Sequence, residues 1–299
     1  MLVKSSPTGL PLRPSLNRST PAHRNQATKT ETPQQTAPPT DQAFLAGQSL
    51  PKTLESSPVP NVPGSFAVSN PELGAIVCTS PEALQERARQ MSARGITLIA
   101  VRHGESESNK AEVLSGQEET PLNSKGREQA REAARAILAN HDFSPQDLVI
   151  FTSPLSRAED TAIALKELVP QAELHRRPEL AEINFGICEG RAIPEVIDAY
   201  PNFASGHDFA HRFPGGESGL DVMGRFNSFL KEVEENYPNK TVVYFAHSMT
   251  VGMGGLLLGK SGVKGDGSVR FDRKVPNAVP EVLVQARKSP DELGPLFAK

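Results

Sequence analysis

The stretch that decides the fold is TLIAVRHGESESN, which runs from Thr97 to Asn109. Its first five residues are apolar or β-branched, and a short run of this composition is typical of a buried β-strand. The run stops abruptly at Arg102-His103-Gly104, so two polar side chains directly follow a strand. A glycine at this point lets the backbone and a ligand approach each other closely. The pattern therefore predicts a functional site where this strand ends.

Two further apolar runs end in the same way. LVIF (148–151) leads into Thr152, Ser153 and Pro154, with Arg157 shortly after, and TVVYFA (241–246) leads into His247. Helical patterns alternate with these strands. Helices are expected from Ser80-Pro81 to Gly95, over 125–139 (with Ala130, Ala133, Ala134, Ile137 and Leu138 on one side), 155–168, 193–200 and 220–236, and after His247; weaker strand signals lie at 268–271 and 281–285.

Repeated strand-then-helix units predict an α/β fold, a three-layer α/β/α sandwich on a mainly parallel sheet. Ligands of such sheets bind beyond the carboxyl ends of the strands. Because parallel strands end at the same edge, we expect His103, Arg157 and His247 to meet there, although they are far apart in the sequence.

The first part of the chain has a different composition. Residues 1 to about 70 hold eleven of the 26 prolines, many Ser, Thr and Gln residues, and two aromatic residues, Phe44 and Phe66. Such a segment buries too little apolar surface to offset the entropy of ordering it. We expect a disordered Pro/Ser/Thr-rich tail over 1–75 and a folded domain over 76–299. The tail is either a linker without a separable function or a targeting, secretion or docking segment with unknown partners.

The net charge and the two cysteines argue against a nucleic-acid-binding, membrane-binding or disulfide-rich protein. A net charge of -3 and a pI near 6.2 give no general attraction to nucleic acid or to anionic lipid, so no partner of either kind is expected. Cys78 and Cys188 indicate free thiols in a reducing compartment rather than a disulfide framework. No apolar run has membrane-spanning length, and the first residues do not resemble a signal peptide. Cytoplasmic location is expected, with secretion without a recognisable signal peptide as the alternative.

The residues gathered at the strand ends suit phosphoryl transfer through a phosphohistidine. His103 would attack phosphorus, Arg102, Arg157 and His247 would neutralise the phosphoryl oxygens, and Glu182 would protonate the leaving oxygen. Taken singly, each residue has an ordinary structural explanation, and only the set points to this chemistry. The reaction needs neither a metal ion nor another cofactor.

The motifs also resemble a known family. RHGES with Asn109 is similar to the signature of the histidine phosphatase superfamily, in its phosphoglycerate mutase-like branch. The resemblance continues in family order through TPLNSKGREQA (120–130), SPLSRAEDTA (153–162), LAEINFGICEG (180–190), PGGES (214–218) and FAHSM (245–249), and it covers about residues 96–285. It implies a phosphoglycerate mutase-like fold for the folded domain.

The resemblance also implies roles for single residues. His103 would be phosphorylated, with Arg102, Arg157 and His247 as the phosphate pocket and Asn109 as a further binding residue. Glu182 would be the proton donor and would later activate water. Ser218, beside Glu217 in a loop that lines the pocket of phosphatase members, is a weaker binding candidate.

The expected function is that of a phosphomonoester hydrolase acting on a small phosphorylated metabolite, with sugar phosphates among the candidates. The stretch between Arg157 and His247 is shorter than the mutases require, which favours a phosphatase. AEINFGICEG followed by RFPGGES resembles fructose-2,6-bisphosphatase domains and broad-specificity phosphatases. The lysine of the bisphosphatase pattern, which would contact a second phosphate, is Gly215 here, and Arg212 and His211 are the residues that could replace it. The alternatives are a phosphoglycerate mutase, or a non-catalytic protein that binds phosphorylated ligands in signalling.

Overall fold

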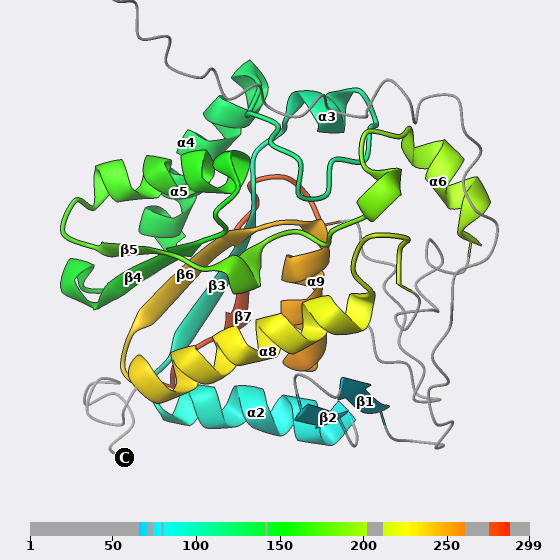
Figure 1. Ribbon diagram of the computed structural model, residues 1–299. Helices are drawn as coiled ribbons and strands as arrows, with labels where there is room; N and C mark the ends of the chain where they lie inside the picture. Colours follow the sequence, from blue (N-terminus) through cyan, green and yellow to red (C-terminus); the bar gives the residue numbers. More distant parts are fainter. Residues whose placement is uncertain are drawn as a thin grey trace, which may run out of the picture. The chain divides into compact units, whose positions relative to one another are not determined.

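A five-stranded sheet forms the centre of the fold (Figure 1). The computed structural model describes residues 66–70, 74–78, 81–140, 143–201, 212–260 and 275–287. The strand order is β5-β4-β6-β3-β7, and among these strands β7 alone is antiparallel to its neighbour. The strands are β3 (Thr97–Arg102), β4 (Leu148–Thr152), β5 (Glu173–Arg176), β6 (Thr241–Ala246) and β7 (Glu281–Val284). The predicted mainly parallel sheet is confirmed.

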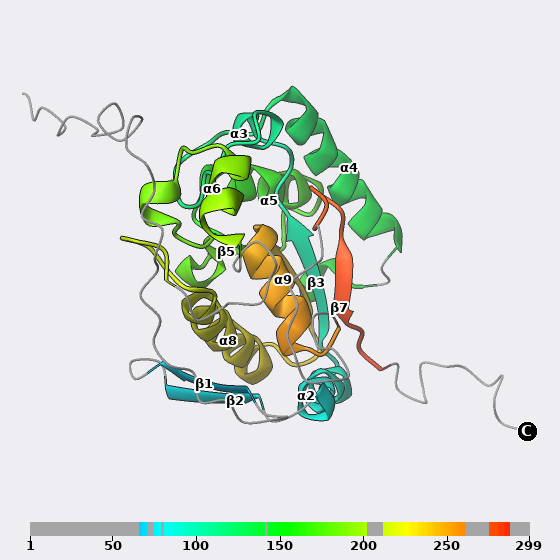
Figure 2. The same cartoon turned by 90° about the vertical axis from the view of Figure 1, so that its right-hand side faces the viewer.

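Helices cover both faces of this sheet (Figures 1 and 2). On one face lie α4 (Ser124–Asn140) and α5 (Ser156–Leu168), and on the other lie α8 (Gly219–Asn236), α9 (Ser248–Leu257) and α2 (Pro81–Ala93). Successive strand residues point to opposite faces, so Leu98 packs in the core under α8 and α9, while Ile99 packs in the core under α4 and α5. The three layers follow from this alternation.

The parallel register aligns the carboxyl ends of β3, β6 and β4. Arg102 pairs with Ala246, and Thr152 pairs with Phe245. Each ladder continues for one residue beyond the strand, because the N–H of His103 donates to the carbonyl of Ala246 at 2.9 Å and the N–H of Ser153 donates to that of Phe245 at 2.9 Å. The residues that follow the three strands therefore share one edge, as the sequence predicts.

Short elements lie in the connections that follow β3 and β5. They are α3 (Glu107–Lys110), the 3-10 turns η2 (Pro178–Leu180) and η3 (Gly186–Cys188), and α6 (Ile193–Ala199); a further turn, η1 (Pro145–Asp147), precedes β4. Figure 1 shows α3 at the top and α6 at the upper right. None of the described helices is long and apolar enough to pass through a bilayer.

Some expectations differ from the structure. A hairpin of β1 (Phe66–Asn70) and β2 (Gly74–Cys78) was not expected, and the boundary placed between residues 75 and 76 falls inside β2. The short strand β5 was not expected either, because its residues ELHR lack an apolar run. Leu138, placed on the inner side of α4, is 36% exposed. Residues 1–65, and the weak strand signal at 268–271, lie outside the described residues.

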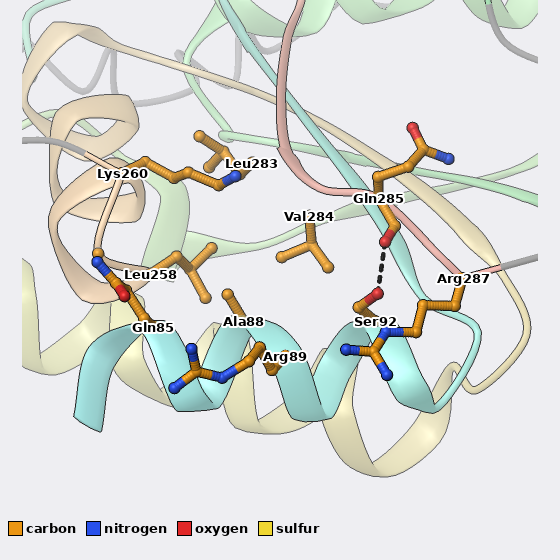
Figure 3. A pocket seen from close by; sticks show the side chains of 11 residues that line it. Gln85, Ala88, Arg89, Ser92, Leu258, Lys260, Leu283, Val284, Gln285 and Arg287 are labelled. Atoms are coloured by element: carbon orange, nitrogen blue, oxygen red, sulfur yellow. Dashed lines mark hydrogen bonds between the residues drawn. The ribbon is translucent and has the colours of Figure 1, made fainter. Parts of the chain in front are cut away.

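A cleft of about 370 Å³ lies at the opposite end of the domain, between α2, the end of α9 and β7 (Figure 3). Its lining includes the cationic side chains of Arg89, Lys260 and Arg287. The side chain of Gln285, another lining residue, donates to the hydroxyl of Thr97 at 3.4 Å. Thr97 begins β3, whereas His103 follows its last residue, so this cleft is separate from the predicted site.

We predict that Phe229→Ala lowers the free energy of unfolding by about 3 to 5 kcal/mol, as is typical when a buried phenylalanine is truncated. Phe229 is 1% exposed, and its ring lies 5.2 Å from that of Phe151 and 5.6 Å from that of Tyr244. Urea unfolding measures the loss. Leu168→Ala, at a position that is 50% exposed, is the control and should change stability by about 0.5 kcal/mol or less. Equal losses in the two variants would contradict this packing.

Candidate active site

The loop after β3 is held against the start of α4 by two glycines. A Cβ atom on Gly104 would lie 2.3 Å from the carbonyl oxygen of Gly126, and one on Gly126 would lie 2.0 Å from that of Glu105. These separations are far below van der Waals contact, so the backbones approach as closely as they do only because neither residue has a side chain. This contact sets where the chain turns after His103.

His103 is buried, and one hydrogen bond of its ring determines which ring nitrogen carries the proton. The side chain is 3% exposed, and Nδ1 lies 2.7 Å from the carbonyl oxygen of Gly104. A carbonyl oxygen only accepts, so Nδ1 carries the proton of the neutral ring and Nε2 keeps its lone pair. Burial, and then the charges of Arg157 and Arg102, hold the pKa of His103 well below its ordinary value. The site therefore keeps this imidazole neutral.

Two arginines lie around His103, and both are anchored by backbone carbonyls. Arg157 is 1% exposed, and its two terminal nitrogens donate to the carbonyls of Glu118 at 2.9 Å and Gly116 at 2.6 Å. Arg102 donates from Nη1 to the carbonyl of Val275 at 2.7 Å. Burial lowers the pKa of both groups, but a guanidinium stays charged in proteins. Their positive charge is fixed in place rather than free to turn.

Three buried nitrogens of this group have no hydrogen-bond partner. They are Nε of Arg102, Nε of Arg157 and Nδ1 of His247, and they make up half of the six such side-chain atoms found among the described residues. The ring of His247 lies 5.1 Å from that of His103, centroid to centroid. An unpaired buried donor costs about 1 to 3 kcal/mol. Three unpartnered nitrogens therefore lie beside one imidazole, and the two arginine N–H groups among them are suited to an anion.

Glu182 supplies a carboxyl group to the same site. It is 9% exposed, and its oxygens accept from the N–H of Ile183 at 3.0 Å and of Met249 at 3.4 Å. Burial raises its pKa, and the N–H of Ile183 and the charge of Arg157 oppose this only in part. Arg225 donates to the carbonyl of Glu182 at 3.0 Å and so holds the backbone at this residue. The environment favours a carboxyl that can hold a proton.

Asn109 and Ser218 occupy different places. The side-chain oxygen of Asn109 accepts from the N–H of Ser106 in the capping box of α3, and it also accepts from Asn277 at 3.3 Å. Ser218 caps α8, and its hydroxyl accepts from the N–H of Asp221 at 3.2 Å. Asn109 is thus linked to the backbone of His103 through Asn277, whereas the described contacts of Ser218 belong to a helix cap.

The loop around Gly215 is held by its own residues and by two neighbouring segments. The carboxylate of Glu217 accepts from Arg225 at 3.2 Å and from the N–H of Asn184 at 2.9 Å. Arg212 donates to Asp221 at 2.8 Å and to the carbonyl of Gly216 at 3.0 Å. His211 lies outside the described residues. In this structure Arg212 is therefore engaged by Gly216 of its own loop and by Asp221 of α8.

Asn277 is a residue of the site that was not expected from the sequence. Its side-chain nitrogen donates to the carbonyl of His103 at 2.8 Å, and the next residue, Ala278, donates its N–H to the carbonyl of Arg102 at 2.8 Å. The segment just before β7 therefore holds the backbone on both sides of the Arg102-His103 bond. No motif marks it. The weak strand signal at 281–285 could have suggested that the residues before it return beside β3.

We predict that inorganic phosphate binds at the three unpartnered nitrogens and raises the thermal midpoint of unfolding, because a ligand of the native state stabilises it. Arg102→Lys keeps the positive charge but loses Nε, and the phosphate affinity should fall at least about tenfold, since a hydrogen bond to a charged group contributes about 1.5 to 3 kcal/mol. Titration calorimetry measures the affinity. Arg89→Lys, in the separate cleft of Figure 3, is the control and should bind as the wild type does. Equal affinities in the two variants would contradict the assignment.

Comparison with known proteins finds relatives that are named as phosphatases or as a phosphoglycerate mutase. Phosphoserine phosphatase 1 of Hydrogenobacter thermophilus is 34% identical over 157 residues, which cover 52% of this chain and 72% of the relative. The 2,3-bisphosphoglycerate-dependent phosphoglycerate mutase of Rhizobium etli is 31% identical over 169 residues, covering 52% of this chain and 76% of the mutase. A mycobacterial glucosyl-3-phosphoglycerate phosphatase, solved with VO3, superposes with a TM-score of 0.52 at 25% identity, covering 64% of this chain and 99% of that chain.

The model of one protein family matches residues 98–259, which is more than half of the chain. The match begins inside β3 and ends just after α9, so it includes the three strands whose ends carry the site. Its description is the histidine phosphatase superfamily, branch 1, and the chain belongs to that family.

Proposed function

We propose that this protein is a phosphomonoester hydrolase that acts on a small phosphorylated metabolite through a phosphohistidine at His103. One observation carries the proposal. An imidazole whose Nε2 keeps its lone pair lies among three buried nitrogens without partners, which are Nε of Arg102, Nε of Arg157 and Nδ1 of His247. The donors suit phosphoryl oxygens, and the lone pair suits attack on phosphorus.

In the first step, Nε2 of His103 attacks phosphorus, and the bond from phosphorus to the ester oxygen breaks. The charge that develops on the phosphoryl oxygens is met by the two arginines and by His247, which are already oriented and shielded from water. Glu182 gives its proton to the departing oxygen, so the product leaves as a neutral alcohol. The enzyme is left with a bond between nitrogen and phosphorus and with a Glu182 carboxylate.

In the second step, water attacks the phosphohistidine. The Glu182 carboxylate takes a proton from that water, the bond between nitrogen and phosphorus breaks, and inorganic phosphate leaves. Nε2 of His103 recovers its lone pair, and Glu182 is protonated again for the next cycle. The raised pKa of Glu182 supports both roles, because burial favours the protonated form that gives the first proton and makes the carboxylate a better acceptor for the second.

Substrates with a single phosphate fit this chain better than bisphosphates. Gly215 stands where the bisphosphatase pattern has a lysine, and its φ of 70° is one that residues with a side chain rarely adopt. Arg212, the neighbouring cation, is occupied by Asp221. The relatives named phosphoserine phosphatase and glucosyl-3-phosphoglycerate phosphatase indicate the compounds to test first, with sugar monophosphates beside them.

The mutase relative supports a second candidate, which the same assay decides. With 3-phosphoglycerate and a bisphosphoglycerate primer, a hydrolase releases inorganic phosphate, whereas a mutase forms the isomer without net release. Binding of phosphorylated compounds without turnover of any of them would instead favour a non-catalytic role.

We predict that a radiolabelled phosphomonoester leaves its label on the wild-type protein after a rapid quench. The label should survive alkali and be lost in acid, as expected for phosphate on histidine, and a metal chelator should not reduce phosphate release. His103→Ala should take up no label. The matched control is His175→Ala, on β5 and outside the site, which should be labelled like the wild type. Turnover by His103→Ala at the wild-type rate would refute the mechanism.

We predict a bell-shaped dependence of kcat/KM on pH. As the pH falls, activity is lost when His103 takes a proton, and because its pKa is lowered this limb lies below pH 6.5. As the pH rises, activity is lost when Glu182 gives up its proton, and because its pKa is raised this limb lies above pH 4.5. Glu182→Gln, which cannot titrate, should lower the rate by about 10²- to 10⁴-fold and remove the alkaline limb. An alkaline limb that persists in this variant would assign it to another group.

A further inference from the structure

The hydrogen bond between His247 and Ser153 determines which ring nitrogen of His247 carries the proton. Nε2 of His247 lies 2.8 Å from the hydroxyl oxygen of Ser153, and both residues are 0% exposed. The other ring nitrogen, Nδ1, is one of the three buried atoms without a partner. A neutral imidazole has a single N–H, so the bond at Nε2 decides whether Nδ1 is a donor or a lone pair.

The other contact of Ser153 settles the direction of this bond. The N–H of Leu155 donates to the hydroxyl oxygen of Ser153 at 3.2 Å, so that oxygen already serves as an acceptor. Among the described residues, the hydroxyl proton has one acceptor within reach, which is Nε2 of His247. The reverse direction would leave a buried O–H unpaired, at a cost of about 1 to 3 kcal/mol. Nε2 therefore accepts, and Nδ1 carries the proton.

We infer that Ser153 is a positioning residue that holds His247 in the tautomer with its proton on Nδ1, so that a neutral ring donates to a phosphoryl oxygen. This inference rests on the proposed function for the identity of the anion. Both histidines then carry their proton on Nδ1, but they use different ring nitrogens. In His103, Nδ1 donates to the carbonyl of Gly104, and the lone pair on Nε2 is available. In His247, Nε2 accepts from Ser153, and the N–H at Nδ1 is available.

The surroundings of His247 keep its ring neutral, so the position of its one proton decides whether Nδ1 can donate. Burial is the largest cause that keeps the pKa of His247 well below its ordinary value, followed by the charge of Arg157. Arg225 and Arg102 act in the same direction. The ring therefore stays neutral beside the arginines, and a lone pair on Nδ1 would face the phosphoryl oxygens and repel them.

The direct test is nuclear magnetic resonance of the full chain carrying isotope-labelled histidine. Long-range couplings between ring nitrogens and ring hydrogens distinguish the two tautomers, and the His247 signals are assigned by their loss in His247→Gln. We expect the wild type to show the proton on Nδ1. Ser153→Ala should populate the other tautomer and bind inorganic phosphate about tenfold more weakly. Ser153→Thr keeps the hydroxyl and should retain the Nδ1 tautomer. Ser92→Ala, in the cleft of Figure 3, is the control and should match the wild type in both measurements.

A wild-type His247 with its proton on Nε2 would overturn the inference, and this outcome does not depend on whether Ser153→Ala folds. An unchanged tautomer and unchanged phosphate affinity in folded Ser153→Ala would also overturn it. The tautomer is read without substrate, so the proposed function fails separately: a wild type with Nδ1 protonated that binds phosphate but turns over no phosphomonoester would retain the inference and refute the hydrolase.

Discussion

The parallel ladder between β3 and β6 is the constraint on which the site depends. Because Arg102 pairs with Ala246, the next residue of each strand, His103 and His247, emerges at the same level of the sheet. Neighbouring strands are about 4.7 to 4.9 Å apart, which agrees with the 5.1 Å between the two ring centroids. A shift of one residue in this register would move one ring to the other face of the sheet. The core on both faces fixes this register, so the packing of the sheet determines where His103 and His247 lie.

Burial then gives the gathered groups their properties. In water, the guanidinium and imidazole groups would be hydrated and mobile, but here backbone carbonyls hold Arg157 at both terminal nitrogens and leave Nε unpaired. The same burial keeps the histidines neutral and raises the pKa of Glu182. In the proposed function, an anion would recover the free energy lost by leaving donors unpaired, because the fixed positive charges suit a phosphoryl group.

The ends of the strands could be predicted from the sequence, because a short apolar run and the polar residues after it form a local pattern. His103, Arg157 and His247 follow apolar runs, and the parallel topology brought them together, so this part of the site could be predicted. Asn277 could not, because its role consists of one bond to a backbone carbonyl from a distant segment, which leaves no local pattern. Ser218 matched a family motif, yet the structure uses its hydroxyl to cap α8, a role that any helix start can give a serine.

The central claim is that His103 and the three unpartnered nitrogens form one site for a phosphoryl group. A crystal structure of the full chain with orthovanadate tests it most directly, since vanadate adopts the geometry of phosphoryl transfer. The account predicts vanadium bonded to or in contact with Nε2 of His103, with its oxygens within hydrogen-bond distance of Nε of Arg102, Nε of Arg157 and Nδ1 of His247. Vanadate bound elsewhere, with these nitrogens still unpaired, would contradict it.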